Sequence, residues 1–275
     1  MTAGRSTPAE SVRIALAHLC LGLLLVHPLD ATGARAGTQV ARSEQAAAPA
    51  LPSVDDVLEK YRRAIGGPAA IKKHRSRRIL GRFELTAQAI GGPLEIVSAA
   101  PDRLLLRMEL GGLGRVERGF DGKSGWSIDP GIGPRLLEGR ELEELRHSAD
   151  FYSELKDVSQ FASATLVERT VFETKDCYVV KLVRPYGVEV TEYYDTGTGL
   201  LAGSRMNSTS AMGTIPTTVV VDEYKTFDGV LLPTKARQRA MGVEWVLVTT
   251  SVEHDKVPAD AFVVPPEIVA LRSKQ

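Results

Sequence analysis

Cysteine is almost absent from this chain of 275 residues, which holds only two, Cys20 and Cys177. Two cysteines are too few for a disulfide scaffold or for a four-cysteine zinc site. An excess of one charge is absent as well, because 34 Lys and Arg residues balance 34 Asp and Glu residues. Nucleic-acid binding needs a basic excess that displaces counterions, so we expect no nucleic-acid partner.

Histidine is scarce, and beyond residue 36 the chain keeps only His74, His147 and His254. None of them lies about three to five residues from another histidine or a cysteine, which is the spacing of common metal sites. The sequence therefore predicts no metal site. His147 and His254 stand among charged residues, so we expect both to be solvated at the surface.

Catalytic signatures are missing too, although short stretches imitate them. Gly122-Lys123-Ser124 resembles the end of a phosphate-binding loop, but Glu117 stands where that loop needs a glycine. Asp195-Thr196-Gly197 has the order of an aspartic-protease motif, yet that chemistry needs two carboxylates, and a hairpin turn favours the same residues. We therefore predict no catalytic residue and no cofactor. An exported hydrolase that uses His147 or His254 with nearby carboxylates is the less favoured alternative.

The longest apolar run lies near the N-terminus, at residues 14–29, and two arginines precede it. The run is too short and too interrupted for a comfortable membrane span, but it suits a secretory signal that ends at Ala34-Arg35-Ala36. We therefore predict a cleaved signal peptide over residues 1–36 and a periplasmic location. An uncleaved signal that anchors the chain is the alternative.

The rest of the chain, from residue 37 on, is predicted to be a linker followed by one domain. Residues 37–52 are rich in alanine and are predicted to be a flexible linker, and residues 53–275 are predicted to form a single domain. A helix is predicted to start at Ser53, because Asp56 follows it at the spacing of a capping box. Its apolar stripe includes Val57, Leu58 and Tyr61.

Beyond residue 78 the pattern changes to short extended runs separated by turn residues such as Asp228-Gly229. One helix is predicted between the two strand-rich halves, over residues 138–155. Connections this short make the sheet antiparallel. The predicted fold class is α+β, with a single large curved antiparallel sheet, an incomplete β-barrel of about 11–12 strands, and helices packed over its concave face. The predicted strands are residues 79–89, 93–100, 103–110, 115–120, 125–129, 165–172, 177–184, 188–194, 200–207, 217–224, 230–239 and 243–253.

Some of these strands are apolar on both faces, as residues 219–221 and 243–248 illustrate. A sheet with one solvated face does not need this, whereas a sheet that curves around an apolar space does. Plain packing of the strands against the helices is an equally good explanation of the pattern alone. The candidate lining of such a cavity is Val57, Leu58, Tyr61, Phe83, Leu104, Leu106, Met108, Trp126, Val219, Trp245 and Leu247.

Several motifs between residues 53 and 266 together resemble those of the outer-membrane lipoprotein-sorting proteins of the LolA/LolB superfamily. They include the helix start at residues 53–61 with Ile65-Gly66-Gly67, and the stretches at residues 101–103, 120–126, 193–201 and 224–233. Most of these motifs are turns, so they specify a fold more than an activity. The chain differs from the lipoprotein carrier itself in being longer and in the helical stretch at residues 138–155.

The resemblance implies an incomplete antiparallel barrel closed by helices, without catalytic residues or a cofactor. It also implies a non-enzymatic periplasmic carrier or binding protein for lipid or lipoprotein acyl chains, which exchanges cargo with a membrane or membrane-protein donor and acceptor. The alternative on the same fold is a periplasmic sensor or regulatory protein that acts through a protein partner.

Overall fold

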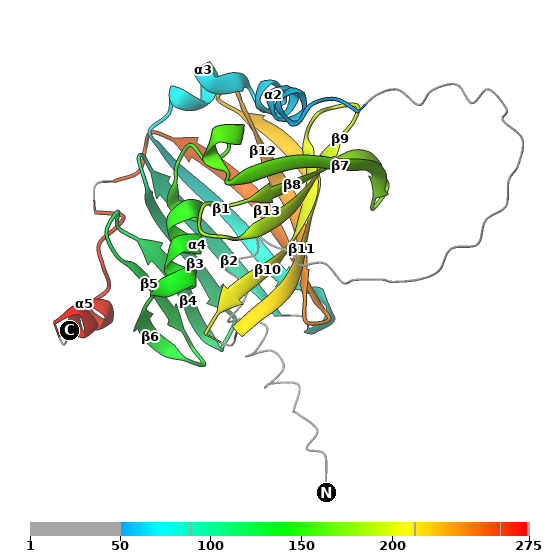
Figure 1. The fold of residues 1–275 in the computed structure, drawn as a ribbon. Helices are drawn as coiled ribbons and strands as arrows, with labels where there is room; N and C mark the ends of the chain where they lie inside the picture. Colours follow the sequence, from blue (N-terminus) through cyan, green and yellow to red (C-terminus); the bar gives the residue numbers. More distant parts are fainter. Residues whose placement is uncertain (1–50, 89, 212, 259, 274–275) are drawn as a thin grey trace, which may run out of the picture.

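Thirteen strands in the described part of the chain form one antiparallel sheet (Figure 1). The structure is a computed structural model that describes residues 51–88, 90–211, 213–258 and 260–273, so the predicted signal peptide and most of the predicted linker lie outside the described residues. The strand order is β6-β5-β4-β3-β2-β1-β13-β12-β11-β10-β9-β8-β7, which leaves β6 and β7 as edges of an unclosed sheet. The strands are β1 (Ser76–Leu85), β2 (Ile90–Ala99), β3 (Arg103–Leu110), β4 (Gly114–Phe120), β5 (Gly125–Asp129), β6 (Gly133–Leu136), β7 (Ser163–Phe172), β8 (Lys175–Val183), β9 (Glu189–Asp195), β10 (Leu201–Ser210), β11 (Gly213–Phe227), β12 (Val230–Ala240) and β13 (Val243–His254).

The sheet curves around α4 (Gly139–Ala149), which crosses one of its faces (Figure 1). This helix contacts β3, β4 and β5 and also β10, and these strands lie far apart in the order of the sheet. One helix reaches both groups only because the sheet bends toward it. We call the face toward α4 the concave face and the opposite one the outer face. An open, curved antiparallel sheet with helices confirms the predicted fold class.

The other helices cover both faces. α2 (Val54–Ala64) and α3 (Gly67–Lys72) lie together at one end of the sheet (Figure 1). α2 begins with the predicted capping box, in which the Ser53 hydroxyl accepts from the backbone N–H of Asp56 at 3.1 Å and the Asp56 carboxylate accepts from the backbone N–H of Ser53. α5 (Pro266–Arg272) packs on the outer face. None of the helices among the described residues is long and apolar enough to span a bilayer.

The structure differs from the sequence prediction in several element boundaries, such as the end of β1 at Leu85 where residues 79–89 were predicted, and in one missed strand. The helix predicted over residues 138–155 ends at Ala149, because the Asp150 carboxylate accepts the backbone N–H of Tyr152 at 3.0 Å and so favours a turn. The sequence also missed β6, an edge strand without apolar alternation that pairs Arg135 with Ser127 of β5. The predicted Asp-Gly hairpin between β11 and β12 is confirmed, since Asp228 and Gly229 have φ of 50° and 88°.

Candidate functional site

The strand register places nearly all of the predicted cavity residues on the concave face. Phe83 of β1 pairs with Leu247 of β13, and Trp245 pairs with Gln238, which in turn lies beside Val219. Residues that pair directly on neighbouring strands point to the same face, so these side chains share one surface. The same reasoning puts Leu104, Leu106 and Met108 of β3 on that face, and Val57, Leu58 and Tyr61 of α2 pack against it.

Trp126 is the exception, because it lies on the outer face. It pairs with Gly119, which pairs with Leu105, and both neighbours face away from α4. Its ring packs with Phe262 and Ile268 of the C-terminal segment, and its indole N–H donates to the Glu117 carboxylate at 3.2 Å. The proposed lining therefore consists of the other predicted residues without Trp126.

The lining residues divide among three apolar clusters. The α2 residues join Val219 in the first cluster, at the end of the sheet that α2 and α3 cover. Leu104 packs with Phe120 and α4 in a small separate cluster. The remaining five form part of a cluster that we call the strand-only cluster, because every described member lies on a strand. Its predicted members are Phe83, Leu106, Met108, Trp245 and Leu247.

A buried ion pair on the concave face was not predicted from the sequence. The Lys156 ammonium lies 2.7 and 2.8 Å from the two carboxylate oxygens of Glu192, and the two residues are only 8% and 3% exposed. The Tyr194 hydroxyl donates to the same carboxylate, and the Lys156 ammonium lies 5.1 Å from the ring centre of Tyr61. Burial tends to raise the pKa of Glu192, but the neighbouring cations Lys156 and Arg184 outweigh burial and lower it. Glu192 is therefore a carboxylate at neutral pH.

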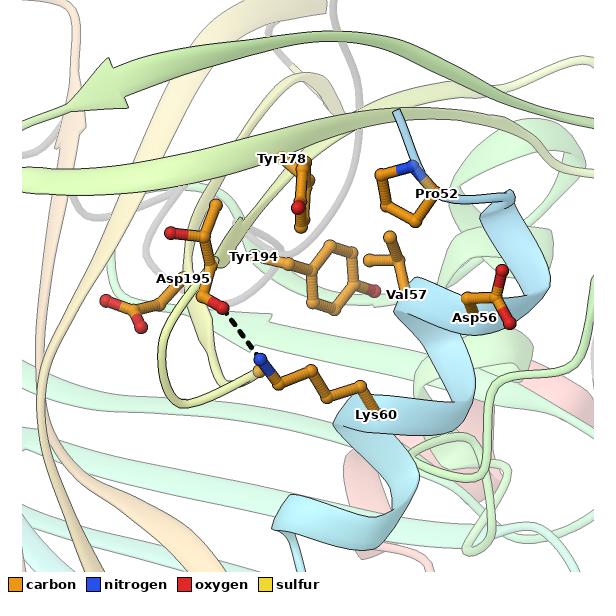
Figure 2. A pocket seen from close by; sticks show the side chains of 9 residues that line it. Pro52, Asp56, Val57, Lys60, Tyr178, Tyr194 and Asp195 are labelled. Carbon is orange, nitrogen blue, oxygen red and sulfur yellow. Dashed lines mark hydrogen bonds between the residues drawn. The ribbon is translucent and has the colours of Figure 1, made fainter. Parts of the chain in front are cut away.

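A small pocket opens beside this pair, between α2 and the strands β8 and β9 (Figure 2). Val57, Tyr178 and Tyr194 form its apolar wall, and Lys60 crosses to the sheet, where its ammonium donates to the backbone oxygen of Thr196 at 2.7 Å. Its volume is about 170 Å³, below the roughly 300–1,000 Å³ of typical ligand sites. In this docked position of α2 the pocket is too small to hold a whole long acyl chain.

Two acidic side chains of α4 form hydrogen bonds to strands on both sides of the concave face. Glu141 accepts from Arg118 of β4 at 2.6 Å and from Arg135 of β6, so one end of α4 is tied to the first half of the sheet. Glu144 accepts the backbone N–H of Thr209 of β10 at 3.3 Å, which ties the helix to the second half. Burial raises the pKa of Glu144 to about 7. The helix thus bridges the two halves through polar contacts.

Two of the described histidines, His74 and His254, are buried against each other, and each contacts an aspartate. The expectation that His254 is solvated is wrong: it is 8% exposed, stacks on His74 at 4.0 Å between ring centres, and contacts Asp228 at 3.0 Å. His74 similarly contacts Asp255 at 2.8 Å. Among the described residues no group of three His, Cys, Asp or Glu side chains could hold a metal ion.

Two solved structures share this architecture. A LolA superfamily protein from Nitrosomonas europaea aligns with a TM-score of 0.51 and 15% identity, over 78% of this chain and 99% of that chain. A DUF1329 family protein from Desulfovibrio piger aligns with a TM-score of 0.52 and 10% identity, over 78% and 98%. No protein-family model and no curated protein matches the sequence. The chain therefore has a LolA-like fold, which confirms at the level of the fold the resemblance seen in its motifs.

Proposed function

We propose that this chain is a non-enzymatic, exported carrier or binding protein for the acyl chains of lipids or lipoproteins, held against the concave face. The observation that carries the proposal is the strand-only cluster, in which Phe83, Met108 and Trp245 come from different parts of one curved sheet. A protein that only had to cover its sheet would pack helix residues against such a surface. Here the strands enclose the apolar interior by themselves.

The free energy available from this interior is sufficient for a lipid. Each methylene moved from water into an apolar interior contributes about 0.8 kcal/mol, so burying about ten methylenes offsets about 8 kcal/mol of the cost of taking the chain out of a membrane. The cluster is closely packed, since Phe83, Met108 and Trp245 are each at most 1% exposed. An acyl chain therefore enters by moving the two halves of the sheet, or α4 between them, apart. The polar ties of Glu141 and Glu144 are the contacts that such an opening breaks.

The two tryptophans of the chain give a direct test, because they lie on opposite faces. In Trp126→Phe only Trp245 of the concave face fluoresces, and in Trp245→Phe only Trp126 of the outer face does. A brominated fatty acid quenches an indole only at short range. We expect it to quench Trp245 strongly in the first variant and Trp126 little in the second.

The second variant is the matched control for nonspecific adsorption, and both variants are first shown to unfold cooperatively. Saturable quenching of Trp245 together with weak quenching of Trp126 supports the carrier. Equal quenching of both tryptophans, or none of Trp245, would overturn it. In that case a stable complex with a protein partner, isolated from the periplasm, would favour the regulatory alternative.

A further inference from the structure

Arg184 is a buried arginine without an acidic partner. It directly follows β8, in which Val180 and Leu182 face the concave interior, so alternation points its side chain to the same face. The residue is 5% exposed. Across the described ranges no carboxylate forms an ion pair with its guanidinium, and the Nε atom is buried without a hydrogen-bond partner.

The contacts that Arg184 does make do not balance its charge. Its guanidinium carbon lies 4.9 Å from the ring centre of Phe161, a cation–π contact, and such a contact contributes less than the burial of an unpaired charge costs. Glu192 acts on Arg184 only from a distance, because both of its oxygens are bound by Lys156 and one by Tyr194. Two cations therefore share one carboxylate, and one positive charge is left over.

Two further polar groups converge on this place. The Tyr186 hydroxyl is buried and has no hydrogen-bond partner, and Arg184 lies close enough to affect its pKa, which burial raises to about 12. His147 of α4 lies close enough to Arg184 for that charge to affect its pKa. Burial, with Arg184 and then Lys156, lowers the pKa of His147 to about 3, so its ring is neutral and can donate one N–H. His147 is only half-buried, which leaves this corner of the interior close to solvent.

We propose that Arg184 and Tyr186 form a binding site for one carboxylate or phosphate group, the acidic head of the amphiphile whose acyl chain occupies the apolar interior. The inference rests on the proposed carrier function for the acyl part and adds the class of head group. A guanidinium binds an oxyanion through paired N–H groups, and the unpartnered Tyr186 hydroxyl supplies a further donor. The charge of the anion balances that of Arg184, which the Lys156–Glu192 pair leaves without a partner.

The test compares a charged and a neutral ligand with the same acyl chain: a dibrominated stearic acid and its methyl ester. Binding of each is followed by quenching of Trp245 in the Trp126→Phe background. We expect the acid to bind about tenfold more tightly than the ester, the effect of one hydrogen bond to a charged group. Arg184→Met is expected to reduce acid affinity to that of the ester and to leave ester affinity unchanged.

Arg205→Met is the matched control, because Arg205 is an exposed arginine on the outer face, stacked over Phe172 and Tyr193. It is expected to keep the preference for the acid. Should Arg184→Met fail to fold, the comparison of acid and ester in the parent protein still decides the matter. Equal affinities there, or a preference that survives Arg184→Met, would overturn the head-group site while the carrier function stands.

A second measurement separates a lipid head group from a free anion. Inorganic phosphate is added at constant ionic strength, with chloride as the reference, and the unfolding midpoint is measured. If neither stearate derivative binds, the carrier function fails; a phosphate-dependent rise in midpoint that Arg184→Met removes then supports a site for free phosphate. No binding of either ligand and no effect of phosphate would overturn both proposals.

Discussion

Replacing Glu192 by glutamine should destabilise the fold more than any other single change at the buried ion pair. Glu192→Gln preserves the size of the side chain and removes its charge, which leaves Lys156 and Arg184 buried without a carboxylate. Removing one partner of a buried pair costs about 3–5 kcal/mol. Burial already lowers the pKa of Lys156 even with Glu192 beside it.

The size of this loss has an upper limit that depends on pH. Lys156 can escape the cost of an unpaired charge by releasing its proton. From an unfolded pKa of about 10.4, that release costs at most about 5 kcal/mol at pH 7 and about 2 kcal/mol at pH 9. A lysine with a depressed pKa in the folded state loses stability as the pH falls, so the penalty of Glu192→Gln should shrink between pH 7 and pH 9.

Lys156→Met is the matched comparison, and it should cost less, about 2 kcal/mol. It removes hydrogen bonds to a charged group, but Glu192 keeps the Tyr194 hydroxyl and the field of Arg184. Urea denaturation of both single variants and the double variant measures each loss and their coupling, which should be favourable and well above 0.5 kcal/mol. A smaller loss for Glu192→Gln than for Lys156→Met, or a penalty that does not change with pH, would refute the reasoning.

Two further predictions concern α4 and the turn after α2. The raised pKa of Glu144, about 7, means that the folded state holds a proton that the unfolded state releases, so stability is greatest below pH 4.5 and falls as the pH rises through 7. The free energy of unfolding is measured by denaturation at pH 5 and at pH 8, and its decrease between the two should be up to about 3 kcal/mol smaller in Glu144→Gln than in the parent protein. An unchanged pH profile would contradict this. Gly66→Ala should cost about 2 kcal/mol or more, because Gly66 has φ of 114° and an added Cβ would lie 2.3 Å from the backbone oxygen of Gly229. Gly67→Ala, with φ of 79° and open space, should cost only about 1 kcal/mol, and equal unfolding midpoints would show that the contact with Gly229 does not matter.

Local features of this fold could be predicted from the sequence because their causes are local. Ser53 and Asp56 satisfy each other's backbone groups within one turn, and Asp228-Gly229 adopts the positive φ angles that its residues favour. The antiparallel sheet follows from such short connections. The edge strand β6 and the early end of α4 were harder to predict from the sequence. The strand depends on its pairing with β5, and the end of the helix depends on one side-chain hydrogen bond.

The candidate site was only partly predictable, for a different reason. Alternation separates the two faces of a strand, but it does not say which face is concave. Trp126 and Leu104 are both large and apolar, and it takes the strand register and the packing of Phe262 and Ile268 from the far end of the chain to assign Trp126 to the outer face. Arg184 likewise gives no local signal, because a lone arginine beside a Pro-Tyr-Gly turn is ordinarily a solvated residue.

The distribution of charge inside the curved sheet favours a ligand over a purely structural role. Buried ion pairs can often be replaced by apolar residues at no loss of stability, so stability alone gives no reason to keep Lys156, Glu192 and Arg184 inside. Phe83 and Trp245 lie in one apolar part of the interior, and another part, apolar around them, carries these charges with one positive charge in excess. An apolar interior with one unpaired cation is complementary to a molecule with an acyl chain and an acidic head. A neutral ligand would leave Arg184 unpaired in both the free and the bound protein, and for this reason the acid and its methyl ester should not bind alike.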